Sequence, residues 1–319
     1  MKAAVYSQPG APEVLRYQEV PDPVCAPDGV LIRVEAIAIE GGDLIHRAAS
    51  PPPRPDHIPG FAAAGEIVAV GAQVRDRRIG QKVTSFDMAG SHAALRAVAA
   101  SRTWLMPEGL DMAAGAALPI AFGTADHCLF ARAGLGAGET VLVQAGAGGV
   151  GLAAIQLAHR AGATVLATVS GAARAERLAA LGLDHAIDHR AVDPVEAVLR
   201  HTGGRGVDLV LDPVGSTLQA SLAALRPEGR LVFVGNAGGA GLEVSLWPAL
   251  QANQTLHGVF MGTQFEKPEV YSSVSRLLQR AASGELEVVI DRRFPLSAAA
   301  EAHAHAESGS LLGRVVLIP

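Results

Sequence analysis

The sequence predicts an α/β fold in which a doubly wound parallel sheet is inserted into a discontinuous, mainly β domain. Three observations carry this prediction. From about residue 120, short β-branched runs alternate with Ala- and Leu-rich stretches of helical length. The residues before 120 hold short apolar runs separated by Pro and Gly, which is typical of a twisted β domain. After residue 263 the alternation stops, so the last segment is assigned to the first domain.

Composition supports two folded domains and excludes several functions. The 319 residues are 49% apolar and 18% charged, which excludes a disordered chain. A net charge of −5 leaves no basic surface for nucleic acid. The two cysteines, Cys25 and Cys128, are too few for a disulfide framework, so we expect a reducing cytoplasm. No signal peptide is visible, and glycines and glutamines interrupt the apolar run at 141–158, so no membrane partner is expected.

The first domain is expected to contain residues 1–119 and 264–319. Its apolar runs between turn residues predict strands, and two amphipathic stretches near the C-terminus predict helices. The expected strands are 30–36, 65–70, 82–85, 288–293 and 314–318, and the expected helices are 268–283 and 297–307.

The second domain, residues 120–263, is expected to consist of βαβ units that cover both faces of a parallel sheet. The expected strands are 140–144, 164–168, 185–187, 207–212, 230–235 and 255–261, and the expected helices are 150–161, 172–181, 195–201 and 218–225. The strand at 255–261 would lie at the sheet edge. Because an exposed apolar edge favours pairing with its own copy, we expect a homodimer.

A glycine motif follows the first strand of this domain. Gly146, Gly148 and Gly151 have the G-x-G-x-x-G spacing, with Gly149 and Val150 between them, directly after an apolar strand and before an Ala-rich helix. Glycines allow the tight turn, the close approach of a pyrophosphate and close packing of helix on strand. The helix start adds free N–H groups and a partial positive charge. This context favours a dinucleotide site over a simple strand-to-helix turn.

The end of the second strand indicates which dinucleotide binds. An NAD enzyme places Asp or Glu there against the ribose hydroxyls, whereas this strand ends in Thr-Val-Ser-Gly at 168–171. Ser170 is small and polar, and Arg174 and Arg177 follow at helical spacing, so a 2′-phosphate could pair with a guanidinium. We therefore predict NADPH over NADH. The alternative is that the arginines form an ordinary solvated helix face.

Motifs along nearly the whole chain resemble the medium-chain dehydrogenase/reductase superfamily, and within it the zinc-independent quinone oxidoreductase branch. Besides the glycine turn, they are MKAAV at 1–5, PGFAAAGEIVAVG at 59–71, GQKV at 80–83, LP at 118–119, GTA at 123–125, GETVLV at 138–143, DPVG at 212–215, GRLV at 229–232 and GN at 235–236. The resemblance implies a Rossmann domain inserted in a GroES-like catalytic domain.

The same resemblance bears on zinc. Glu40, Phe61 and Ile120 stand at the positions where zinc-containing relatives hold their metal, and Phe and Ile cannot bind one. No metal is therefore expected. Relatives carry an Asn three residues before a catalytic Asp, and here the pair is Glu40 and Asp43. Either Glu40 is a proton donor with a raised pKa, or it pairs with a nearby Arg.

Further site residues are implied by the resemblance. Thr124 would lie beside the nicotinamide, and His189 stands where a Tyr often approaches the adenosine phosphate. Arg314 would reach the pyrophosphate or be a surface strand cation. Three residues would line the same site at the ends of parallel strands, namely Asn236, Phe260 and Met261.

Three further histidines lie outside the motifs. His92 is interpreted as a hydrogen-bonded core histidine, with an acid near neutral pH as the alternative. His303 and His305 are interpreted as structural or exposed.

The expected activity is NADPH-dependent, zinc-free hydride transfer to a quinone or an α,β-unsaturated carbonyl. Two alternatives remain open. The same residues would allow reduction of another carbonyl or of an acyl-thioester-linked alkene. From a different class, the chain could be an NADPH-binding regulatory or crystallin-like protein with little catalysis.

Overall fold

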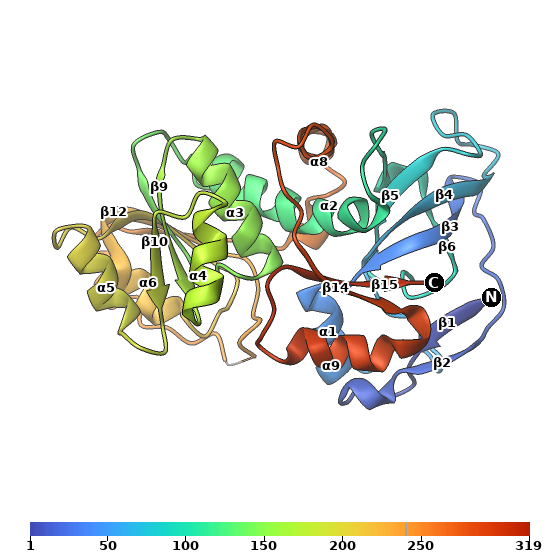
Figure 1. Ribbon diagram of the computed structural model, residues 1–319, viewed down its shortest axis with the longest axis horizontal. Coiled ribbons are helices and arrows are strands. Elements are labelled where there is room, and N and C mark those ends of the chain that lie inside the picture. The colour runs from blue at the N-terminus through green and yellow to red at the C-terminus, as the bar shows by residue number, and fades with distance from the viewer. Residues whose placement is uncertain (240) are drawn as a thin grey trace. The chain divides into compact units, whose positions relative to one another are not determined.

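The computed structural model describes residues 1–239 and 241–319, and the chain divides into two compact units. The first unit contains Met1–Gly123 and Gly262–Pro319, and the second contains Thr124–Met261. The sequence places the corresponding boundaries after residue 119 and after residue 263. Figure 1 follows the chain by colour from blue at the N-terminus to red at the C-terminus.

A seven-stranded sheet forms the centre of the first unit, as far as the chain is described. Its order is β14-β15-β3-β4-β5-β7, and β6 pairs with β3. The strands β14 and β15 run parallel, and the other pairs run antiparallel. A separate antiparallel pair joins β1 (Lys2–Val5) to β2 (Arg16–Glu19). The sheet strands are β3 (Gly29–Ala38), β4 (Ala62–Val70), β5 (Lys82–Phe86), β6 (Leu95–Ala99), β7 (Thr103–Leu105), β14 (Ile290–Pro295) and β15 (Arg314–Ile318).

Helices complete the first unit. The β-branched side chains of Ile32, Ile67 and Val83 are fully buried in a core that also contains Leu296, Ala299 and Ala302 of η5 and α9. The helices are α1 (Gly41–Ala49), α2 (Met112–Asp126), α8 (Pro268–Ala282) and α9 (Ala299–Glu307), with short turns η1 (Pro12–Val14), η2 (Ala100–Arg102), η4 (Met261–Thr263) and η5 (Leu296–Ala298).

Helix α2 departs from the expectation of a β-rich segment up to residue 119. It runs through the expected boundary and contains Pro119, and a π-helical turn, η3 (His127–Arg132), follows it. The side chains of Ala113, Ala116 and Leu118 are buried. A helix that is apolar on all sides has no 3.6-residue alternation, so its sequence gives no amphipathic signal.

A parallel sheet in the order β10-β9-β8-β11-β12-β13 forms the second unit. Strand β8, which comes first along the sequence, lies inside the sheet and has neighbours on both sides. Right-handed crossovers in the two directions therefore place helices on both faces of the sheet. The fold class predicted from the sequence is therefore confirmed (Figure 1). The strands are β8 (Thr140–Val143), β9 (Thr164–Val169), β10 (His185–Asp188), β11 (Val207–Asp212), β12 (Leu225–Phe233) and β13 (Thr255–Gly258), and the helices are α3 (Gly149–Arg160), α4 (Ala172–Ala179), α5 (Pro194–His201), α6 (Leu218–Ala224) and α7 (Trp247–Gln251).

In the second unit, two strands differ from their expected bounds by more than two residues at one end. Strand β12 begins at Leu225, before the expected start at residue 230, and β13 ends at Gly258. Pro227 and Gly229 are residue types common in turns, and they disfavour a strand before residue 230. Glu228, which lies between them, adopts a positive φ of 61°.

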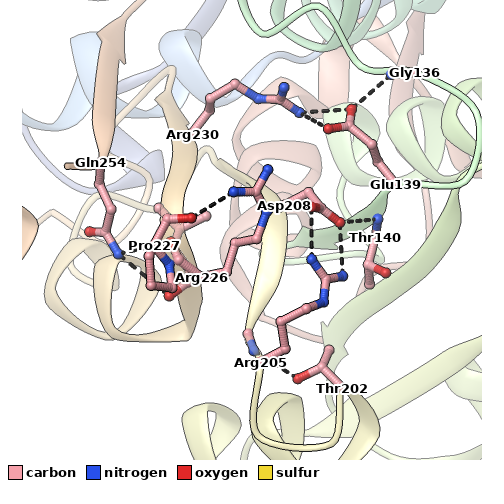
Figure 2. A network of polar contacts seen from close by, with 12 residues as sticks. Gly136, Glu139, Thr140, Thr202, Arg205, Asp208, Arg226, Pro227, Arg230 and Gln254 are labelled. Carbon is pink, nitrogen blue, oxygen red and sulfur yellow. Dashed lines mark hydrogen bonds and ion pairs between the residues drawn. The ribbon is translucent and has the colours of Figure 1, made fainter. Parts of the chain in front are cut away.

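Figure 2 shows an ion-pair network at the amino end of β11. Asp208 accepts from both Nη atoms of Arg205 at 2.9 and 3.0 Å, from Arg226 Nε at 2.6 Å and from the Thr140 N–H at 2.8 Å. Burial raises the pKa of Asp208, but the bonds from Arg205, Thr140 and Arg226 outweigh it, so the pKa is lowered. The network ties β8, β11 and β12 together.

No helix in the described part of the chain is both long enough and apolar enough to cross a membrane.

Candidate dinucleotide site and buried carboxyl pair

The glycine motif lies between β8 and α3, as the sequence predicts. Ala145 adopts a positive φ of 54°, and its N–H donates to Thr168 Oγ1 at 2.9 Å. The Gly146 N–H donates to the Thr168 carbonyl at 2.9 Å, and the Gly148 N–H donates to the Ala145 carbonyl at 3.0 Å. The turn is therefore held by its own backbone and by β9.

The three motif positions are glycine for different physical reasons. A Cβ on Gly151 would lie 2.4 Å from the Ala145 carbonyl oxygen, and a Cβ on Gly146 would lie 2.8 Å from the Ala167 Cβ. Both glycines are therefore required by packing. A Cβ on Gly148 would meet only the Ala145 oxygen, at an ordinary 3.4 Å, and its φ of −77° suits any residue. Among residues 1–239 and 241–319, no packing contact requires a glycine at position 148.

Gly148 is also the N-cap of α3, and no side chain caps this helix. The first N–H groups of a helix have no partner within the helix, and the helix dipole adds partial positive charge there. A helix start without a capping side chain, next to a glycine that leaves space open, is suited to bind a phosphate.

The predicted 2′-phosphate residues lie together at the carboxyl end of β9. Arg174, on α4, donates from Nη1 to Ser170 Oγ. The His189 N–H donates to the Val169 carbonyl at 3.2 Å, which places His189 beside the same strand end. Ser170, Arg174 and His189 therefore gather at one edge of the sheet.

Asp188, an acid at this edge, was missed by sequence reasoning. Its carboxylate accepts from the Arg190 N–H at 3.0 Å and the Gly171 N–H at 3.2 Å, and these bonds lower its pKa. Asp188 ends β10, whereas the acid that contacts the ribose in NAD enzymes is expected at the end of β9. The pairing of Asp188 with Val169 in the parallel ladder brings it to the end of β9.

The other predicted cofactor residues have separate positions. Asn236 follows β12 and lies against Gly215, since a Cβ added to Gly215 would be 2.6 Å from Asn236 Oδ1. Phe260 is exposed, Met261 is buried at the start of η4, and Thr124 is buried near the end of α2. Their roles stay predictions.

The predicted catalytic carboxyls lie at the start of α1 in the first unit. Glu40 is the N-cap residue, and its N–H donates to Asp43 Oδ2 at 2.8 Å. Both side chains are buried, Glu40 with 2% and Asp43 with 1% of their surface exposed. Arg314, at the start of β15, forms an ion pair with Glu40 through Nη2 and Oε2.

Burial controls the protonation of this pair. It raises the pKa of Glu40 to about 8, against the opposing pull of the Arg314 guanidinium. It raises the pKa of Asp43 to about 7, although the Glu40 N–H, Arg314 and Arg96 lower it. The contact with Arg314 agrees with the alternative in which Glu40 pairs with a nearby Arg, and its role as a proton donor stays a prediction.

The ion pair also places Arg314. Its side chain is 14% exposed and directed to Glu40 in the first unit, so it is not simply a surface cation. Its predicted contact with a pyrophosphate stays a prediction.

The three histidines that lie outside the motifs are structural in the first unit. His92 is fully buried, and its Nε2 lies 2.9 Å from Nε2 of the buried His303, while its Nδ1 lies 3.1 Å from Ser91 Oγ. Burial lowers the pKa of His92 to about 3 and also lowers that of His303, so the pair is neutral. His305 bonds Asp291 at 2.7 Å. The interpretation of His92 as a hydrogen-bonded core histidine agrees with these contacts.

Two of the three positions at which the resemblance places zinc ligands in relatives carry apolar side chains here, Phe61 and Ile120. The Phe61 ring packs on the first turn of α1, since a Cβ on Gly42 would lie 2.3 Å from it, and it meets His46 and Phe86 edge to face. Across residues 1–239 and 241–319, no three His, Cys, Asp or Glu side chains lie together in an arrangement that could hold a metal ion.

Two family models match the chain. The alcohol dehydrogenase GroES-like domain matches residues 26–147, and the zinc-binding dehydrogenase domain matches residues 149–280. Together they cover most of both units.

Full-length relatives agree with these matches. The chain is 32% identical to a 2-haloacrylate reductase of Burkholderia sp over 99% of this chain and 98% of the relative. It is similar to the structure of Escherichia coli quinone oxidoreductase complexed with NADPH, with a TM-score of 0.95, 29% identity and coverage of 100% of both chains. A quinone oxidoreductase structure from Pseudomonas syringae pv. Tomato DC3000 gives a TM-score of 0.94 at 29% identity, covering 100% of this chain and 99% of that one.

Proposed function

This chain belongs to the medium-chain dehydrogenase/reductase superfamily, in its zinc-independent quinone oxidoreductase-like branch, and from that membership we propose that it is an NADPH-dependent oxidoreductase. Its substrate is proposed to be a quinone or an α,β-unsaturated carbonyl compound, reduced by hydride transfer without zinc. We place the enzyme in the cytoplasm, consistent with its free Cys25 and Cys128.

The observation that carries the proposal is Gly148. Packing explains Gly146 and Gly151, whereas a Cβ on Gly148 would meet no close neighbour in the described part of the chain, and this supports a ligand that approaches the backbone there. The pyrophosphate would lie against Gly148 and the start of α3, and Ser170 with Arg174 would hold the 2′-phosphate.

The substrate class rests on relatives and on chemistry. A 2-haloacrylate, the substrate in the name of the Burkholderia relative, carries an alkene conjugated to a carboxylate, and two similar structures are quinone oxidoreductases. Both classes offer an electrophilic atom that can accept a hydride without a metal, because conjugation spreads the resulting negative charge.

The chain's own groups would complete the reduction. NADPH, when bound, supplies the hydride. Glu40, whose pKa is raised to about 8 by burial, is the proposed donor to the reduced substrate, while Asp43 accepts the Glu40 N–H and fixes its backbone. Thr124 is proposed to lie beside the nicotinamide.

The test is NADPH oxidation, followed by absorbance, with a panel of quinones, enones and a 2-haloacrylate. We expect turnover of at least one substrate class and little turnover with simple ketones. If no member of the panel is reduced, the proposed activity is wrong.

One observation favours a second candidate. The Glu40 carboxyl is bound by Arg314, which would suit a protein that binds NADPH and regulates a partner instead of reducing substrate. Tight NADPH binding without any turnover would favour this candidate. If an acyl-thioester-linked alkene were the one substrate reduced, the substrate class would instead be acyl-thioester alkenes.

A further inference from the structure

Four buried polar side chains connect the glycine turn to the neighbouring strands of the second unit. The Ala145 N–H donates to Thr168 Oγ1 at 2.9 Å, and the Thr168 hydroxyl donates to Gln144 Oε1 at 2.9 Å. Gln144 Nε2 donates to Ser221 Oγ at 3.1 Å, and the Ser221 hydroxyl donates to Asp212 Oδ2 at 2.7 Å. None of the four side chains is more than 4% exposed.

The direction of these bonds is fixed by the supply of hydrogens. A hydroxyl has one hydrogen to donate, and the carboxylate of Asp212 can only accept, so Ser221 must donate to Asp212 and accept from Gln144. The Gln144 amide must then turn its oxygen to Thr168, whose hydroxyl accepts from the Ala145 N–H. Reversing any one bond would leave a buried polar group without its partner.

The hydrogen-bond chain ends at a side-chain carboxylate that also positions a second loop. Asp212 Oδ1 accepts from the Val214 N–H at 2.8 Å and the Gly215 N–H at 3.0 Å, and Oδ2 accepts from the Thr217 hydroxyl at 2.7 Å. Gly215 has a φ of 81° and lies against the side chain of Asn236. Residues 213–217 are therefore positioned by the same carboxylate that accepts the last bond of the hydrogen-bond chain, and Asn236 lies against this loop.

Ala145 needs this support. It is a non-glycine residue with a φ of 54°, a conformation that costs free energy and persists only where surrounding contacts impose it. The bond from its N–H to Thr168 Oγ1 is one of those contacts, and it comes from a side chain on β9 and not from the turn itself.

We propose that Thr168, Gln144, Ser221 and Asp212 form one directed hydrogen-bond chain that sets the position of the glycine turn relative to residues 213–217. Thr168, Gln144 and Ser221 are positioning residues for the dinucleotide, since they act through the backbone of the turn. This part of the inference rests on the proposed NADPH site, whereas the mechanical link between the two loops does not.

The first experiment measures hydrogen exchange without any nucleotide. In Ser221→Ala, amides of residues 145–149 should exchange about tenfold faster than in the wild type, although Ser221 does not touch that turn. Faster exchange confined to α6 and residues 213–217 would overturn the proposed link.

The second experiment measures the Kd for NADPH. We expect Thr168→Val to raise it about tenfold and Thr168→Ser, which keeps the hydroxyl, to restore it. Thr202→Val is the matched control, because the Thr202 hydroxyl also accepts a backbone N–H, from Gly206 at 3.0 Å, and donates to a carbonyl, of Val198 at 2.8 Å. It lies in the network of Figure 2, and its variant should keep the wild-type Kd.

The two experiments separate the possible failures. A wild type that binds no NADPH contradicts the proposed function, while the exchange result still decides on the link. If NADPH binds and the variants of Thr168 and Thr202 have equal Kd values, the positioning role is wrong.

Discussion

Glu40 is a buried carboxyl whose proton decides what it can contribute. Its pKa is raised to about 8 by burial, so it is protonated over most of the neutral range. A pKa raised in the folded state stabilises the fold at acidic pH, and this contribution is lost as the pH rises towards 8. The side chain is therefore best able to donate a proton below pH 8.

Glu40→Gln tests this donation. If Glu40 supplies the proton, kcat/KM of the wild type falls about tenfold per pH unit above about pH 8, and the variant is slow with no such fall. The measurement is the pH dependence of kcat/KM between roughly pH 6 and pH 10, because Lys and Tyr side chains titrate above that range. An unchanged alkaline fall in the variant would assign it to another group.

Arg174→Ala tests the choice of dinucleotide. Removing the guanidinium beside Ser170 should raise the Kd for NADPH about tenfold and leave the Kd for NADH unchanged, since only NADPH carries the 2′-phosphate. Arg200→Ala, on an exposed face of α5, is the control and should change neither value. An equal loss of affinity for both nucleotides would mean that Arg174 does not read the 2′-phosphate.

At the scale of elements, the local pattern was sufficient where apolar runs are bounded by turn residues. The βαβ units of the second unit and the glycine turn follow from runs of apolar residues and their punctuation. Helix α2 was missed because its apolar residues surround it. The Glu40–Arg314 and His92–His303 contacts could not be predicted, because each joins residues more than 200 positions apart and no local pattern specifies such a pairing.

Polar residues within apolar strands gave a signal that was not used. Gln144 and Thr168 stand at the ends of buried strands, where each needs a hydrogen-bond partner. Their direct link could be suspected from that requirement, but its continuation to Ser221 and Asp212 required the strand order β9-β8-β11.

Asp208→Asn tests the network that joins β8, β11 and β12. The variant loses the charge that pairs with Arg205 and Arg226, and the free energy of unfolding should fall by about 2 to 3 kcal/mol. Because the folded-state pKa of Asp208 is lowered, its contribution is present above pH 4 or so and is lost as the pH falls below that, so the difference should shrink in acid.

A matched control accompanies this substitution. Glu66→Gln removes an exposed pair with Arg33 and should cost about 1 kcal/mol or less. Chemical denaturation at neutral and acidic pH measures both. Equal losses for Asp208→Asn and Glu66→Gln would mean that the network contributes no more than a surface pair.

At the scale of the whole molecule, an open sheet edge in the second unit supports a proposed assembly. Strand β13 is the last strand of the parallel sheet, and Leu246, Trp247 and Leu250 on or beside α7 expose 55%, 64% and 66% of their surfaces. An open edge next to exposed apolar side chains favours association with a second copy. We propose a homodimer through this edge.

Sedimentation of the wild type and of Trp247→Asp tests the dimer. The wild type should sediment as a dimer at micromolar concentration, and the variant should dissociate because the charge would be buried in the interface. Val24→Asp is the control, since Val24 is 87% exposed in the first unit and should not affect association. A monomeric wild type contradicts the proposal.

The proposed dinucleotide site depends on the space left open at Gly148, and Gly148→Ser tests it most directly. Serine is a favourable N-cap residue, so the free energy of unfolding should stay the same or rise. The decisive measurement is the Kd for NADPH by titration calorimetry, alongside the unfolding midpoint. A rise in Kd of about tenfold or more at unchanged stability is expected, because the side chain fills the place of the pyrophosphate. A variant that binds NADPH as tightly as the wild type would contradict a dinucleotide site at this turn.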